Sequence, residues 1–175
     1  LLGSSMKGYN VINPAAQCFS QNTLTSTVLF LFAYYLPTAY TITGVKWFQT
    51  VLQAGNANYN GVALYSYSGG TLTLVASSTN DANCWNQAGT LVWKTKDFSS
   101  TYSASAGIYY IGLVFNGTTA PTIGIYTGFV ATTAGNYDFT NSARINYTTS
   151  GISLPSSLVA SSLTGGSNNF TCFLY

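Results

Sequence analysis

The chain has 175 residues, a length that suits one domain with its own core. Only 5% of its residues are charged, against about 25% in ordinary soluble domains, and its net charge is +2. This composition offers no basic surface for nucleic acid. Aromatic residues at 15% of the chain argue against disorder. We therefore expect a single folded domain over residues 1–175, with residues 1–22 as an N-terminal arm or linker.

The longest apolar run extends from Val28 to Leu36 and ends at Pro37. A membrane-spanning helix needs about 20 apolar residues, so we expect no membrane insertion. The N-terminal residues lack the long apolar region of a secretory signal peptide. A start at Leu-Leu-Gly-Ser-Ser rather than at methionine predicts a piece of a longer protein.

Runs rich in β-branched and aromatic residues follow one another along the chain and predict strands. They lie at residues 23–36, 41–52, 61–67, 71–77, 90–97, 107–115, 122–127 and 169–174, with a short addition at 144–148. Gly69-Gly70 predicts a hairpin turn, and no window shows helical periodicity. We therefore expect an all-β, antiparallel, jelly-roll-like β-sandwich of about eight strands.

The run at residues 28–36 is apolar on both of its faces. A strand of a two-sheet sandwich has one core face, so the second apolar face needs a cover. Either a loop segment or another subunit could supply it. We favour a subunit, with Leu29, Leu31 and Tyr35 at the interface of a homo-oligomer.

The residues that catalysis needs are scarce. The chain has no histidine, which excludes Ser-His-Asp and Cys-His arrangements. Its acids are Asp81, Asp97 and Asp138, in separate predicted loops and at a strand end, and nothing in the sequence pairs them for acid–base work. We expect a protein that is not an enzyme and that has no catalytic residues and no cofactor.

The three cysteines, Cys18, Cys84 and Cys172, are widely spaced. Without histidine or a close cysteine pair, zinc binding is excluded in practice. We expect three reduced, partly buried thiols, and the alternative is a Cys18–Cys172 bridge that joins the ends. The segment Asn80 to Asn83 has a single carboxylate, which predicts Asx turns rather than a calcium site. We therefore expect no metal.

Two predicted loops contain the residue types that bind glycans, namely aromatic rings that stack on sugars and amide or carboxylate groups that hydrogen-bond to hydroxyls. The candidate ligand-binding residues are Asn58 and Tyr59 in one loop and Asp81, Asn83, Trp85 and Asn86 in the other. For Trp85 we favour a different role, as a plug that closes one end of the sandwich.

A family resemblance is carried by motifs between Ile42 and Pro121. They are ITGV at 42–45, GVALY at 61–65, GTL at 70–72 with VAS at 75–77, Trp85 before Ala88-Gly89, Phe98, Tyr102, AGIYY at 106–110 and Ala120-Pro121. This stretch, under half of the chain, resembles a jelly-roll-like β-sandwich domain of bacteriophage tail, fibre and other minor virion proteins. The motifs are structural and bring no catalytic residues with them.

The resemblance implies a domain on the virion surface, often a homotrimer, that binds a host-surface glycan or receptor or decorates the particle together with other virion proteins. Two alternatives stay open. One is a carbohydrate-binding module of a secreted bacterial protein, and the other is a purely structural, capsid-associated subunit without a ligand.

Overall fold

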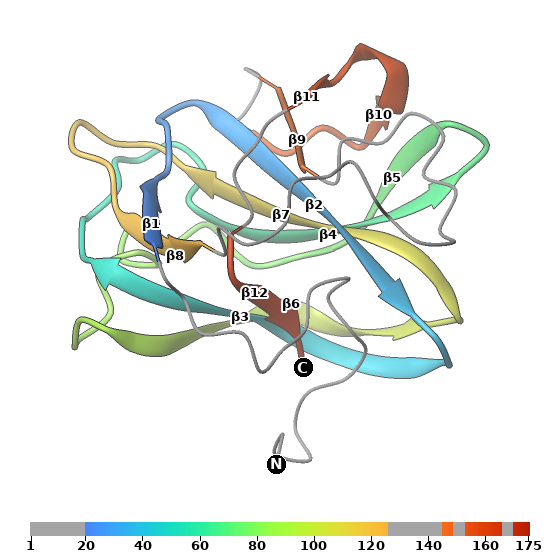
Figure 1. Ribbon diagram of the computed structural model, residues 1–175, viewed down its shortest axis with the longest axis horizontal. Helices are drawn as coiled ribbons and strands as arrows, with labels where there is room; N and C mark the ends of the chain where they lie inside the picture. The colour runs from blue at the N-terminus through green and yellow to red at the C-terminus, as the bar shows by residue number, and fades with distance from the viewer. Residues whose placement is uncertain (1–19, 126–144, 149–152, 166–169) are drawn as a thin grey trace.

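The computed structural model describes residues 20–125, 145–148, 153–165 and 170–175. Two antiparallel sheets pack face to face in a β-sandwich (Figure 1), which confirms the predicted all-β, antiparallel architecture. Apart from one three-residue 3₁₀ turn, Ala160–Ser162, these residues form only strands and loops.

Eight strands give the sandwich its connectivity. One sheet, which we call the β3 sheet, has the order β1-β8-β3-β6 and is formed by β1 (Ser20–Thr23), β8 (Thr122–Ile125), β3 (Tyr40–Val51) and β6 (Val92–Ala104). The other, the β2 sheet, has the order β2-β7-β4-β5 and is formed by β2 (Val28–Leu36), β7 (Gly107–Phe115), β4 (Gly61–Ser68) and β5 (Thr71–Ser77). The chain crosses between sheets at every connection except the β4–β5 hairpin, which gives the jelly-roll order.

Four short strands are added to this frame. In the β2 sheet, β9 (Ile145–Thr148) and β11 (Thr164–Gly165) extend the edge at β2, and β10 (Ser157–Val159) pairs with β5 at the other edge. The last strand, β12 (Cys172–Leu174), pairs with β3 on the side of β8. The C-terminal segment lies beside β3 just past the point where the β8–β3 pairing ends. Phe170 pairs with Ile125 at the end of β8, and Cys172 pairs with Trp47 of β3.

Most strands lie where the sequence predicts them. β5 and β7 have the expected bounds, and Gly69 and Gly70 both take the positive φ angles, 55° and 81°, that the predicted hairpin turn requires. Three strands, β1, β10 and β11, were not anticipated. Residues 20–22, expected in the N-terminal arm, belong to β1, while residues 1–19 lie outside the described part of the chain.

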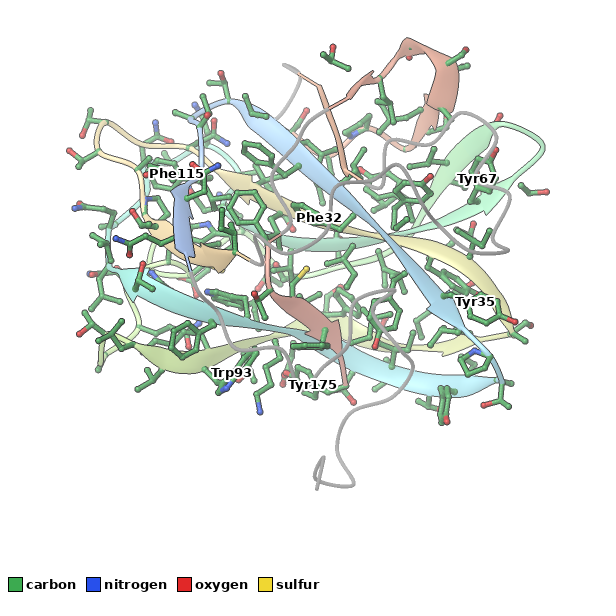
Figure 2. All side chains as sticks on the ribbon, viewed as in Figure 1. Phe32, Tyr35, Tyr67, Trp93, Phe115 and Tyr175 are labelled. Atoms are coloured by element: carbon green, nitrogen blue, oxygen red, sulfur yellow. The ribbon has the colours of Figure 1, made fainter. Side chains whose placement is uncertain are left out.

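The core between the sheets is largely aromatic. Phe30, Phe32, Tyr34 and Leu36 of β2 point into it, with Phe32 visible between the layers in Figure 2. The rings of Phe30 and Phe32 meet the Phe170 ring edge-on, with centroids 5.3 and 5.2 Å apart. Such pairs add about 0.5–1.5 kcal/mol each beyond the burial of their area. The C-terminal segment is therefore part of the core.

The outer face of the β2 sheet is buried by the chain itself. Leu29 and Leu31 are both 0% exposed and belong to a second apolar cluster. The residues of this cluster and those packed against it include Ala63, Tyr65, Leu72, Tyr110, Val114, Leu154, Leu158, Ala160 and Leu163. Gly112 leaves room there, since an added Cβ would lie 3.1 Å from Leu29 Cδ1. The sequence left two possible covers for this face, a segment of the same chain or another subunit. The structure has a segment of the same chain, residues 153–163, in this place.

Backbone and side-chain hydrogen bonds fasten this segment, which we call the outer strap. Leu74 N donates to Ser156 O at 2.9 Å, Ala160 N to Gly70 O at 2.8 Å, and Tyr65 Oη to Pro155 O at 3.0 Å. Of the interface expected at Leu29, Leu31 and Tyr35, the two leucines are corrected accordingly, and Tyr35 stays a prediction. Leu29 and Leu31 have no surface left for a subunit, and Tyr35 is half-buried.

Replacing Leu31 with alanine should lower the free energy of unfolding by about 2–5 kcal/mol, because the side chain is fully buried. The control is Val159→Ala in the strap, a position that is 56% exposed, where we expect a change within about 0.5 kcal/mol. Denaturant unfolding measures both. If Leu31→Ala instead dissociated an oligomer with little loss of stability, Leu31 would be shown to contact a subunit.

Candidate functional site

The long loops of the jelly roll gather at one end of the sandwich, on the left in Figure 1. They join β1 to β2 (residues 24–27), β3 to β4 (52–60), β5 to β6 (78–91) and β7 to β8 (116–121). At the opposite end, the connections among the described strands of the jelly roll are the short ones at 37–39, 69–70 and 105–106. The topology therefore brings together the two loops that the sequence singled out.

Hydrogen bonds join these two loops directly. Asn60 N donates to Asn80 Oδ1 at 2.9 Å, and Asp81 N donates to Asn60 O at 3.0 Å. Asn80 Nδ2 donates to Ala57 O at 3.0 Å, and Gly55 N to Ala82 O at 2.7 Å. Amides thus replace charged groups as the polar links of this end.

Asn60 organises the β3–β4 loop from inside. Its side chain is fully buried and donates to the carbonyls of Asn56 and Asn58 at 3.1 and 2.9 Å, while its Oδ1 accepts from Asn116 N at 2.7 Å. Asn58, one of the expected ligand residues, is exposed beside it. The sequence indicates a polar loop here, but it does not show that Asn60 is buried and structural while Asn58 is exposed.

Tyr59 serves the fold rather than an open site. Its ring packs against the cluster under the outer strap, and its hydroxyl lies 3.1 Å from Val62 O and 3.0 Å from Ser78 O. Burial raises the pKa of this phenol to about 12, so it remains a protonated donor at neutral pH.

Trp85 is a core residue. It is 0% exposed, its ring centroid lies 4.8 Å from that of Trp47, and its Nε1 donates to Val114 O at 2.9 Å. The side-chain amide of Gln49 donates to the Trp85 carbonyl and its Oε1 accepts from Trp47 Nε1. No ring face of Trp85 is left for a sugar, so its place among the ligand candidates is corrected to the plug.

Asp81 borders a hollow with a volume of about 450 Å³, which we call the edge hollow. It lies between the β5–β6 loop and β6, a strand that pairs with β3 alone among the described strands. Its lining residues are Thr79, Asp81, Gln87, Thr95, Lys96, Asp97, Phe98 and Ser99. Asn83 and Asn86 are exposed in the same loop but are not in this lining.

Charge is concentrated at the edge hollow. The described residues contain five charged side chains, and three of them, Asp81, Lys96 and Asp97, line this one hollow. The two carboxylates were not expected to meet, because they are 16 positions apart and lie on different elements. A signal was present in the run Lys94-Thr95-Lys96-Asp97, since charges on both faces of a strand indicate an edge.

Fixed hydrogen bonds shape the hollow. Lys96 Nζ donates to Asp81 Oδ2 at 2.7 Å and Asn83 N to Asp81 Oδ1 at 2.9 Å. The Lys96 hydrogen bond is the largest cause that holds the pKa of Asp81 below its ordinary value. On the far wall the Tyr175 hydroxyl donates to Asp97 Oδ1. Burial, and then Asp97, raises the pKa of Tyr175, which keeps this donor protonated.

Gln87 connects the loop to the strand. Its Nε2 donates to Cys84 O and to Thr95 O, both at 3.0 Å. Because Thr95 O accepts from outside the β3–β6 ladder, the backbone groups of Thr95 point toward the hollow, as do those of Asp97 two residues further on. The wall therefore presents backbone as well as side-chain partners to a bound molecule.

The cysteines have no place in this site. Cys84 and Cys172 are both 0% exposed, and burial raises the pKa of each thiol. Cys18 lies outside the described residues, and so does the Cys18–Cys172 bridge that was the alternative to three reduced thiols. Within the described ranges no three His, Cys, Asp or Glu side chains group as metal ligands.

No family model matches the chain, and no curated protein has a similar sequence. In the part of the chain that the structure describes, no helix has the length and apolar character needed to cross a membrane.

Replacing Asn60 with alanine should cost about 1–3 kcal/mol of stability for each buried group that loses its partner, the Asn116 N–H first. Asn58→Ala, at an exposed position in the same loop, is the matched control and should change stability by less than about 0.5 kcal/mol. Thermal unfolding distinguishes them. Equal effects of the two changes would contradict the structural role given to Asn60.

The Asp81–Lys96 pair should make stability depend on pH at the acid end. The folded-state pKa of Asp81 lies below the ordinary value of about 3.9, so the unfolded chain binds more protons than the folded chain in the pH range between the two pKa values. The pair contributes about 0.2–1 kcal/mol to stability, as expected for a partly exposed pair. This contribution is present above the ordinary pKa of Asp81 and is lost as the pH falls through its folded-state pKa. Melting curves of the wild type and Lys96→Met should differ at pH 7 and converge once the pH has fallen below the folded-state pKa of Asp81. A difference that persists unchanged at acid pH would contradict this.

Proposed function

We propose that this chain is a non-enzymatic recognition domain on the virion surface that binds a neutral glycan of a host through the edge hollow. The observation that carries the proposal is the concentration of scarce charge and uncharged hydrogen-bonding groups around one cavity. Its volume of about 450 Å³ lies within the range of small-molecule sites, roughly 300–1,000 Å³.

The chemistry of the lining favours saccharide hydroxyls. Asp81 and Asp97 offer carboxylate acceptors, and the hydroxyls of Thr79, Thr95 and Ser99 can both donate and accept. With two carboxylates against one ammonium the hollow is net negative, which disfavours acidic sugars. Neutral sugars, rich in donors, fit this balance.

Three features support binding over hydrolysis. A glycosidase keeps one of its two carboxyl groups protonated as a general acid, whereas Lys96 lowers the pKa of Asp81 and so favours its ionised form. Asp97 is exposed rather than enclosed in the apolar surroundings that a general acid uses. The buried, protonated thiols of Cys84 and Cys172 offer no nucleophile.

The virion setting rests on the resemblance of residues 42–121 to phage appendage domains and on the jelly-roll order, which viral capsid and lectin domains share. Trimer formation and contacts with other virion proteins belong to the same proposal. A carbohydrate-binding module of a secreted protein would use the same hollow, so sugar binding does not distinguish the two functions. A hydrolase encoded on the same chain would favour the carbohydrate-binding module. A purely structural subunit would bind no glycan.

A glycan array that contains neutral and acidic saccharides tests the proposal. The wild type should bind neutral glycans, and Asp97→Asn, which removes a charged acceptor, should weaken that binding about tenfold or more. The control Asn86→Ala alters an exposed amide in the same loop and should bind as the wild type does. The wild type and both variants should melt alike.

Three results would count against the proposal. They are no binding to any neutral glycan, equal binding by Asp97→Asn, and release of shortened products from a bound saccharide. The last would make the two carboxylates of the hollow a hydrolytic pair.

A further inference from the structure

A row of aromatic rings lies on the outer face of the β3 sheet, next to the edge hollow. The ring centroid of Trp93 is 5.5 Å from that of Phe48 and 5.5 Å from that of Phe173, with interplanar angles of 70° and 51°. Lys46 Nζ lies 5.5 Å from the Trp93 centroid. Contacts on several sides therefore hold the Trp93 ring in one orientation.

Trp93 differs from the other tryptophans in its exposure. Trp47 and Trp85 are 0% exposed, whereas Trp93 is 40% exposed. The Trp93 ring is held in place and is still partly open to water, so it offers apolar surface to a bound molecule. Its surroundings are mixed, with Lys46 above it and Thr95 two residues along the same strand. An apolar ring face with polar neighbours is the surface that stacks on a pyranose.

The ring and the hollow lie along the same strand, β6. Trp93, Thr95 and Asp97 pair with Phe48, Lys46 and Gly44 of β3, so they share one face of β6. At about 3.3 Å per residue, Trp93 and Asp97 are about 13 Å apart along the strand, a span longer than one sugar ring. Figure 2 shows Trp93 and Tyr175, the partner of Asp97, on the side of the β3 sheet that faces away from the β2 sheet.

We propose that the edge hollow and the Trp93 ring form one track for a neutral oligosaccharide laid along β6. One sugar unit lies in the hollow against Asp97 and Gln87, and a following unit stacks on Trp93, with Lys46 donating to its hydroxyls. The inference rests on the proposed function and extends it, because it makes the occupant a chain of sugars and assigns a second subsite to Trp93.

The test is a titration of the wild type with glucose-, galactose- and mannose-based oligosaccharides of one to six units, followed by calorimetry. Affinity should rise about tenfold between one unit and two or three units, the gain expected from a stacked aromatic contact. Trp93→Ala should remove that gain and leave the affinity for the single unit unchanged. Trp93→Phe should keep part of the gain.

Leu91→Ala is the matched control, since Leu91, the last residue of the β5–β6 loop, is 66% exposed and is two positions from Trp93. It should change neither affinity. Equal affinity for every length, or a length gain that survives in Trp93→Ala, would overturn the track while the proposed function stands. If Trp93→Ala changed self-association and left saccharide binding untouched, the ring would be a protein interface and the track would be wrong. Binding of none of these saccharides by the wild type would overturn both proposals.

Discussion

The fold depends on one constraint, which is that the β2 sheet is apolar on both faces. Its inner face, with Phe30, Phe32 and Tyr34, needs the β3 sheet as a partner, and its outer face, with Leu29 and Leu31, needs a second layer. The outer strap supplies that layer from the same chain. Burial at roughly 25 cal/mol per Å² of apolar surface then stabilises the sandwich from both sides, without a disulfide among the described residues and with very few charges.

The scarcity of charge explains where function can be located. Asparagine side chains and backbone groups join the β3–β4 loop to the β5–β6 loop without a charged side chain between them. Of the five charged side chains in the described residues, Lys94, Lys96 and Asp97 belong to β6, an edge strand whose exposed backbone needs protection from unwanted pairing. Lys94 turns inward and donates to Ala88 O, and Lys96 pairs with Asp81. The same bonds that protect the edge position the β5–β6 loop, and this loop with β6 encloses the edge hollow.

Local pattern was enough to predict most of the fold and too little to predict the site. The alternation in β5 and the glycine turn before it are encoded within a few residues, and so is the doubly apolar run of β2. The strap was missed because Leu154, Leu158 and Leu163 are spread through a serine-rich stretch with no strand or helix period. β1, with the sequence SQNT, is short and polar, and only its pairing with β8 defines it. Asp81 and Asp97 line the same hollow because of the path of the β5–β6 loop beside β6, and no local stretch of sequence contains that information.

The central claim, that the chain covers its own apolar sheet, can be measured on a chain diluted until sedimentation shows a monomer. The measurement is the fluorescence of ANS, a dye that reports exposed apolar surface. We predict that the native monomer gives no enhancement of ANS fluorescence, because the strap already covers Leu29, Leu31 and their neighbours. Strong ANS fluorescence of the monomer that disappears as the chains associate would contradict the account. It would show that a second subunit, and not the strap, buries the outer face of the β2 sheet.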